Sequence, residues 1–265
     1  TMDVQVLKTS QVQALSTEQV AAMTSAQVAA WSTAQVAALL TAQINALETE
    51  DFAALSTMQV LVLTTAQLSN LGTALVAAME SGDLAVLTTT QLRAFSTGQV
   101  AVWNSVQAAA LSTTGVQALT TSQVAALGDD PFGALTTAQV VALTTVQVGA
   151  LTTAEIVVLN SAQWVGLETR DVMALLSSQV QVLSTSMISV LPTAQVPVLT
   201  TLAFAALNTD QLTALTTVQM LVLTTQELTC LDTTQLMAFT NTQVAALVTA
   251  QWVGLSPDQV FALGS

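Results

Sequence analysis

The sequence predicts an all-α solenoid, or superhelix, of very short helices, with one helix in each eight-residue repeat. Three observations predict this fold: the period of eight, a helix-start signature in each period, and apolar residues at fixed positions. Written from position 1 as Thr-Thr-Ala-Gln-Val-Ala-Ala-Leu, the octad continues from Lys8 to Leu263 without an insertion or deletion. These 256 residues make 32 complete octads, preceded by a partial octad at residues 1–7. A fixed short period is typical of solenoid proteins.

Positions 1 to 4 carry the signal for the start of a helix. Ser or Thr at position 1 and Gln at position 4 form a capping box, in which each side chain bonds to the other residue's backbone N–H. In the octad that starts at Ser256, Pro257 occupies the first helical position, where its missing N–H costs nothing. The capping residues predicted from this pattern include Gln139, Gln147, Ser256, Pro257 and Gln259.

A helix started at one octad cannot continue through the next. Eight residues at about 100° each advance the Leu stripe by roughly 80° per octad, so a long helix would spread its apolar residues over its whole surface. Each octad is therefore expected to form about one and a half turns, followed by a bend. Such a helix is too short to be stable alone, so contacts with other octads must hold it.

Positions 4, 5, 7 and 8 share one face of the predicted helix, and positions 3 and 6 face outward. Position 8 is Leu in 27 of 33 occurrences, and the others are Met, Phe or Trp. Trp at position 5 is accompanied by Gly at position 7 in residues 164–166 and 252–254, which indicates volume compensation in a packed core. The predicted core residues include Leu135, Val140, Leu143, Trp164 and Trp252.

Position 2 leaves two interpretations open, because it points outward and yet is nearly always Thr or Ser. The hydroxyls of Thr137 and Thr145 would, in the first interpretation, cap helices by bonding to the unpaired carbonyls that end the preceding helix. In the second, the exposed Thr residues form a ladder that binds ice or a glycan. Gln at position 4 has the same ambiguity, between a cap within a buried amide ladder and a ligand contact.

A β-solenoid is the alternative architecture, since Thr, Val and Leu favour strands. The octad has no regular Gly, Asn or Asp for corners, and positions 5 and 8 have opposite parity, so one strand cannot bury both. Pro197, at position 6, is hard to place inside a short helix. The helical fold remains the prediction.

Composition argues against several classes of function. Sixteen acidic residues against three basic ones give a net charge of −13, which disfavours nucleic acid. The longest apolar run, Leu202 to Leu207, is far too short to cross a membrane, so no membrane insertion is expected. With no His and a single Cys, the chain lacks a catalytic triad or zinc site, and we expect no enzyme activity, no metal and no cofactor.

Segments such as Leu135-Thr-Thr-Ala-Gln-Val-Val-Ala-Leu143 resemble the octapeptide arrays of very large exported bacterial proteins, often described as adhesin-like. This resemblance covers the whole chain and implies an extracellular or cell-surface location, without catalytic or ligand residues. Residues 256–263 resemble the opening of the first helix in TAL-effector repeats. The longer repeat, the base-reading loop and the basic surface of that family are missing, so the similarity supports the local helix and not DNA binding.

The sequence therefore predicts a single solenoid domain over residues 1–265, cut from a longer array and able to associate end to end. The expected function is a non-catalytic spacer or presentation scaffold in a larger secreted or surface protein. The alternatives are a repetitive Thr surface for ice or glycan, and a protein-interaction platform. The sequence does not identify a natural partner.

Overall fold

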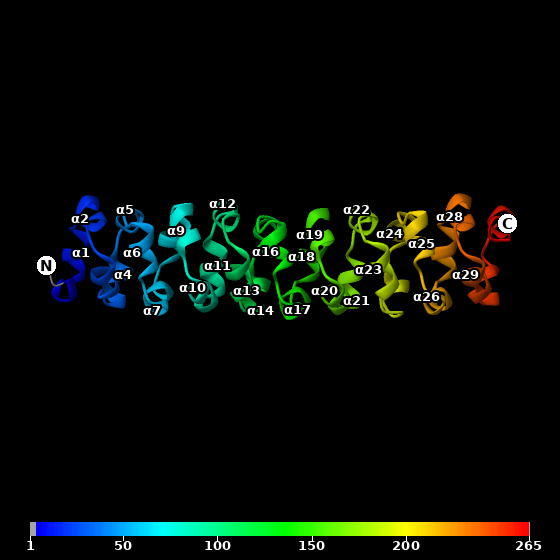
Figure 1. Cartoon of the computed structure of the whole chain (residues 1–265), viewed down its shortest axis with the longest axis horizontal. Coiled ribbons are helices and arrows are strands. Elements are labelled where there is room, and N and C mark those ends of the chain that lie inside the picture. The colour runs from blue at the N-terminus through cyan, green and yellow to red at the C-terminus, as the bar shows by residue number, and fades with distance from the viewer. Residues whose placement is uncertain (1–3, 265) are drawn as a thin grey trace. The chain divides into compact units, whose positions relative to one another are not determined.

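The computed structural model describes residues 4–264, and it divides the chain into two compact units. Unit 1 extends to Ala142 and unit 2 begins at Leu143. Within each unit the chain forms a series of very short helices joined by bends (Figure 1). The helices of unit 1 are η1 (Val4–Val6), α1 (Thr9–Gln13), α2 (Thr17–Ala21), α3 (Ser25–Ala29), α4 (Thr33–Ala38), α5 (Thr41–Asn45), α6 (Thr49–Ala53), α7 (Thr57–Leu61), α8 (Thr65–Ser69), α9 (Thr73–Ala78), α10 (Ser81–Val86), α11 (Thr89–Ala94), α12 (Thr97–Val100), α13 (Ser105–Ala110), α14 (Thr113–Ala118), α15 (Thr121–Ala125), α16 (Asp129–Gly133) and α17 (Thr137–Val141).

Unit 2 has the same construction, with one 3-10 helix in place of an α-helix. Its helices are α18 (Thr145–Gly149), α19 (Thr153–Val158), α20 (Ser161–Gly166), α21 (Thr169–Met173), α22 (Ser177–Gln181), α23 (Thr185–Val190), η2 (Val196–Val198), α24 (Thr201–Ala205), α25 (Thr209–Thr213), α26 (Thr217–Val222), α27 (Thr225–Thr229), α28 (Thr233–Met237), α29 (Asn241–Ala246), α30 (Thr249–Trp252) and α31 (Pro257–Leu263).

Every complete octad thus contains one helix, and the α-helices start where the capping pattern predicts, whereas η2 starts later in its octad, at Val196. Position 1 is the N-cap and is extended, as at Thr136 with φ −67° and ψ 157°. The α-helices are four to seven residues long, and the two 3-10 helices have three residues each. Gly128 is an N-cap with φ +75°, a conformation that side-chain-bearing residues rarely adopt. No strand occurs within residues 4–264, so the all-α prediction is confirmed and the β-solenoid is wrong.

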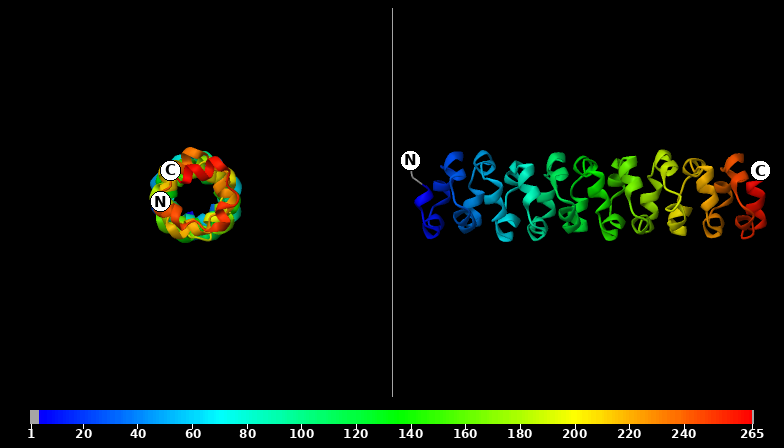
Figure 2. Two further views of the ribbon diagram at one scale, coloured as in Figure 1. Left: turned by 90° about the vertical axis from the view of Figure 1, so that its right-hand side faces the viewer. Right: turned by 90° about the horizontal axis from the view of Figure 1, so that it is seen from below.

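Helices three octads apart pack against each other within each unit. In unit 1, α2 packs on α5, α5 on α8, and α8 on α11; in unit 2, α24 packs on α27 and α27 on α30. The side views show these helices as successive coils of a solenoid inside each unit (Figures 1 and 2). The fold therefore matches the predicted solenoid, with contacts made between octads that are distant in sequence.

The core of each unit is made from positions 5 and 8. Leu135, Val140, Leu143 and Trp164 are all buried, and the Trp164 side chain has no exposed surface. Position 7, expected to face inward, is half-buried in most octads, because the small residue lies at the edge of the inward face. Trp252 is only half-buried, which corrects its predicted core position: no helix three octads beyond α30 covers it in the described residues.

Candidate functional site

The repeated feature with the richest chemistry is the Gln side chain at position 4. Gln139 shows its geometry. Its Oε1 accepts hydrogen bonds from the Thr136 N–H at 2.6 Å and the Thr136 hydroxyl at 2.9 Å. Its Nε2 donates to the carbonyl oxygens of Ala108, Ala109 and Leu111, at 3.1, 3.2 and 2.7 Å. The amide therefore caps its own helix and also binds the end of a helix four octads earlier.

We call this arrangement the glutamine clip: a position-4 Gln, buried in most octads, whose Oε1 accepts from position 1 and whose Nε2 donates to carbonyls 28 to 31 residues earlier. The last carbonyls of a helix have no partner inside the helix, and burying them unpaired is costly. The clip supplies their donors. Contacts to octads both three and four positions away show that one turn of each solenoid takes between three and four octads.

The glutamine clip recurs along both units. At Leu40 and Leu176 no hydroxyl is available at position 1, yet both N–H groups still donate to the position-4 amide, at 2.8 and 2.7 Å. The clip therefore needs the backbone of position 1 more than its side chain. The residues that donate from Nε2 in this way are Gln35, Gln43, Gln59, Gln67, Gln91, Gln99, Gln107, Gln123 and Gln139 in unit 1, and Gln179, Gln211, Gln219, Gln235, Gln243, Gln251 and Gln259 in unit 2.

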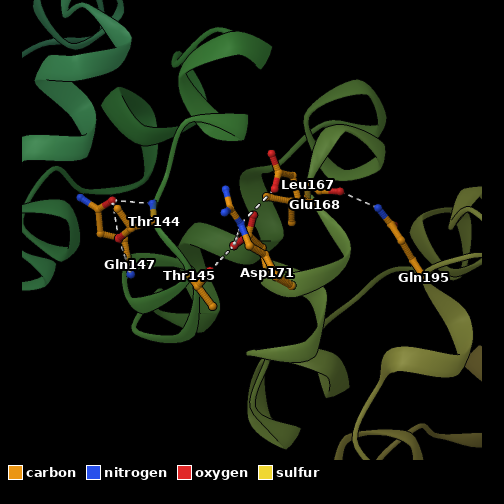
Figure 3. Close-up of polar contacts among 8 residues, drawn as sticks. Thr144, Thr145, Gln147, Leu167, Glu168, Asp171 and Gln195 are labelled. Carbon is orange, nitrogen blue, oxygen red and sulfur yellow. Dashed lines mark hydrogen bonds and ion pairs between the residues drawn. The ribbon is translucent and has the colours of Figure 1, made fainter.

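The other sequence-predicted capping residues lie in the same motif. Gln147 accepts from the Thr144 N–H at 2.8 Å and from the Thr144 hydroxyl at 3.0 Å (Figure 3). Ser256 and Gln259 form a capping box, with Pro257 at the first helical position. Sequence reasoning located these local caps but missed the Nε2 contacts, because no signal within one octad indicates a partner about 30 residues away.

The position-2 hydroxyls do not cap the preceding helix. Thr145 Oγ1 donates instead to Asp171 Oδ1 at 2.8 Å, from an octad three positions later (Figure 3). Ser25 and Asp51 form the same pair at 2.6 Å. The Thr137 side chain is exposed and no hydrogen bond holds it. The structure therefore does not give Thr137 or Thr145 the predicted capping role: Thr145 pairs with a carboxylate from another turn, and Thr137 follows the N-cap Thr136 as the first residue of α17.

Exposed position-2 residues form rows across successive turns. In unit 1, α2, α5, α8, α11, α14 and α17 pack in sequence, and each begins with Thr. Since a turn needs more than three octads, each step in this row falls short of a full turn. The row consequently winds around the unit and does not form a flat ladder. The Thr residues of this row, all exposed except the half-buried Thr41, are Thr17, Thr41, Thr65, Thr89, Thr113 and Thr137.

Several octads carry a carboxylate in place of the clip. Asp83 is buried and its Oδ2 accepts from the Glu80 N–H at 3.1 Å. Burial and, to a smaller extent, the nearby Glu80 charge raise the pKa of Asp83 to about 6, and this hydrogen bond partly opposes them. Asp171 has no exposed surface and lies 3.8 Å from Arg170 Nε, which also binds Glu168 at 2.9 Å (Figure 3). Within the complete octads, the carboxylates at position 4 are Asp51, Asp83, Glu155, Asp171 and Glu227.

The octad at residues 192–199 is the most irregular. Gln195 Nε2 donates to the Leu167 carbonyl at 2.5 Å, but its buried Oε1 has no hydrogen-bond partner (Figure 3). The reason is Pro192 at position 1, which has no N–H to donate. Pro197, at position 6, removes a second N–H, and only the 3-10 helix η2 forms there. Pro197, which was expected from the sequence to be hard to place inside a short α-helix, thus lies in a 3-10 helix instead.

The described residues offer little for other chemistry. No group of three or more His, Cys, Asp or Glu side chains within residues 4–264 is placed to hold a metal ion. None of the helices in that range is both long and apolar enough to span a bilayer. Cys230 is half-buried, and burial raises the pKa of its thiol. The position-4 amides and carboxylates remain the main chemical feature.

The fold and the glutamine clip define a helical repeat protein whose octads are held together by side-chain amides. The ALTTAQ repeat family matches residues 1–30, 22–49, 44–79, 76–113, 114–145, 130–161 and 164–201. Because these matches cover well over half of the sequence, the chain belongs to the ALTTAQ repeat family. The predicted array resemblance is confirmed at this level, and the protein is a repetitive scaffold. A comparison with curated proteins found no match.

Proposed function

We propose that the array is a non-catalytic structural spacer or presentation scaffold within a larger secreted or surface protein. The observation that carries this proposal is the glutamine clip. In each regular octad the position-4 amide is buried and bonded to backbone at both ends, as Gln211 is to Asn208 at 2.9 Å and to Leu183 at 2.7 Å. Groups used in this way stabilise the solenoid and are not available to a substrate.

Two further features support a scaffold. The position-4 polar groups face backbone, whereas the outward positions 3 and 6 vary widely, as a surface without a conserved ligand pattern would allow. Each clip also connects its octad to one four positions earlier, so bending a unit would break buried hydrogen bonds. A stiff element of this kind is suited to keeping other domains of the protein at a distance from each other. End-to-end association with a second copy remains part of the proposal, as does the absence of nucleic acid partners.

The stiffness of one unit can be measured by single-molecule energy transfer. Dyes attached through cysteines at Thr153 and Thr249, both exposed in unit 2, should report a narrow distance distribution that is unchanged by salt. Cys230→Ser removes the native thiol. A broad distribution in native buffer would contradict a rigid spacer. A Gln211→Ala variant should broaden the distribution if the clip provides the stiffness.

The exposed Thr rows favour a second candidate, a repetitive binding surface for a glycan. The rows wind around the unit, so a flat ice lattice would meet few Thr residues at once, whereas a flexible glycan could follow them. Changing Thr65, Thr89, Thr113 and Thr137 together to Val should leave the fold stable, since these side chains are exposed. Loss of glycan retention with unchanged thermal stability would support a binding surface, and equal retention would exclude it.

A further inference from the structure

Glu227 occupies the position of a glutamine clip without the amide. It lies at position 4 of the octad that contains α27, whereas the neighbouring octads carry Gln219 and Gln235 there. Its Oε2 accepts from the Thr224 N–H at 2.7 Å and from the Thr224 hydroxyl at 2.9 Å. These two bonds match those of a Gln Oε1, so the carboxyl group has the orientation of the clip.

The second carboxyl oxygen takes the place of the Gln Nε2. Gln219 Nε2 donates to the carbonyls of Ile188 and Leu191, 31 and 28 residues earlier, at 2.8 and 2.7 Å. The same register directs Glu227 Oε1 to the carbonyls of Val196 and Leu199. Glu227 is only 2% exposed, and its Oε1 is buried without a hydrogen-bond partner. An ionised oxygen would therefore face carbonyl oxygens, with no donor between them.

No cation compensates for this charge. The main elements packed against α27 are α24 and α30, and neither contains an ionisable residue. The octad at residues 192–199, which holds the facing carbonyls, has none either. The other titratable group beside Glu227 is Cys230, whose Sγ donates to the Glu227 carbonyl at 3.1 Å. Burial raises the pKa of Glu227, and the two Thr224 hydrogen bonds only partly oppose this effect.

We propose that Glu227 is a proton-binding clip, in which the protonated Oε1 donates to the Leu199 carbonyl and joins two turns of unit 2. The proton comes from solvent, and no covalent bond changes. Loss of the proton replaces this hydrogen bond with repulsion between oxygens and weakens the joint between α27 and the η2 octad. This makes the contact sensitive to pH, and it is independent of the proposed scaffold function.

The direction of the effect follows from the raised pKa. The folded state holds the proton more tightly than the unfolded chain, so the stabilising contribution is complete below the ordinary glutamate pKa. It is lost as the pH rises through the pKa of the folded state. Unit 2 should therefore unfold more easily at neutral pH than at mildly acidic pH. The difference in the free energy of unfolding is the contribution of the Glu227 contact.

The test compares thermal unfolding of the full chain with that of Glu227→Gln between about pH 4 and pH 8. Gln donates at every pH, so the variant should match the wild type at the acidic end and unfold at a higher temperature at the alkaline end. Asp210→Asn is the matched control, because it removes an equal charge from an exposed site in the same unit. Asp210→Asn should show the same difference in unfolding temperature between acidic and alkaline pH as the wild type. Gln219→Glu should create a second pH-dependent joint.

A carbon-detected NMR titration of the Glu227 carboxyl provides the direct measurement. The proposal expects it to titrate at a higher pH than the exposed carboxyl groups. If it titrates together with them, or if Glu227→Gln keeps the full wild-type pH dependence, the proposal is wrong. A wild-type gain in stability on adding Na⁺ or Ca²⁺, absent in Glu227→Gln, would also overturn it, because a cation and not a proton would then fill the gap.

Discussion

Two octads differ in the backbone nitrogen at position 1: it carries a hydrogen in the octad at residues 136–143 and none in the octad at residues 192–199. In the first, the Thr136 N–H binds Gln139 Oε1 and the amide is fully bonded. In the second, Pro192 has no N–H, and Gln195 keeps one bond to Leu167 while its Oε1 is left unpaired. The difference shows that the clip depends on both ends of the amide, and that one end alone can still join two turns.

Removing the amide should therefore cost more in the first octad than in the second. Gln139→Ala leaves the Thr136 N–H and the Leu111 carbonyl without partners and removes one of the two bonds to the Ala108 carbonyl. Together these losses should lower the free energy of unfolding by about 3 kcal/mol. Gln195→Ala should cost about 1 kcal/mol, because only one bond is lost. Urea unfolding followed by circular dichroism measures both. Equal losses would show that the acceptor end contributes nothing.

The octad that carries Asp83 should differ from the Gln octads in its pH dependence. The pKa of Asp83 is raised to about 6, so its ionisation above that pH destabilises unit 1. Asp83→Asn should gain up to about 2 kcal/mol at alkaline pH and nothing well below the ordinary aspartate pKa. Unfolding curves at several pH values provide the measurement, with exposed Asp258→Asn as the control. A gain that is independent of pH would contradict the assigned cause.

Restoring the missing donor should make the irregular octad more like the regular one. Pro192→Thr supplies a backbone N–H for Gln195 Oε1 and a hydroxyl for the N-cap, and it should stabilise unit 2 by about 1 kcal/mol. Thermal unfolding tests this gain. Pro197→Ala adds a helical N–H at a different site, so its effect should be additive. Destabilisation by Pro192→Thr would show that the proline ring itself supports the fold.

The smallest expected effect separates the two kinds of position-2 Thr. Thr145→Val removes the donor to buried Asp171 and should cost about 1 kcal/mol. Thr137→Val removes an exposed hydroxyl that makes no hydrogen bond and should change stability by less than about 0.5 kcal/mol. Chemical unfolding of the two variants side by side gives the comparison. Similar losses at both sites would point to a general role for the Thr hydroxyls.

The sequence was sufficient for the start of each α-helix and for the burial of positions 5 and 8, which depend on residues within one octad. The capping of Thr136 by Gln139 joins residues three apart, so its geometry follows from the helix start alone. The burial of Val140 and Leu143 follows from the helical wheel in the same way. Pro197 was identified as a strained position because proline removes a local N–H.

The tertiary structure alone decided the contacts between octads. The bonds from Gln139 to Leu111 and from Thr145 to Asp171 depend on how far each bend rotates the chain, and this rotation results from packing across turns. The half-burial of Trp252 likewise depends on which helices cover it. An octad encodes its own helix because capping and periodicity act over a few residues. Its partners are set by the sum of several bends, which no single octad contains.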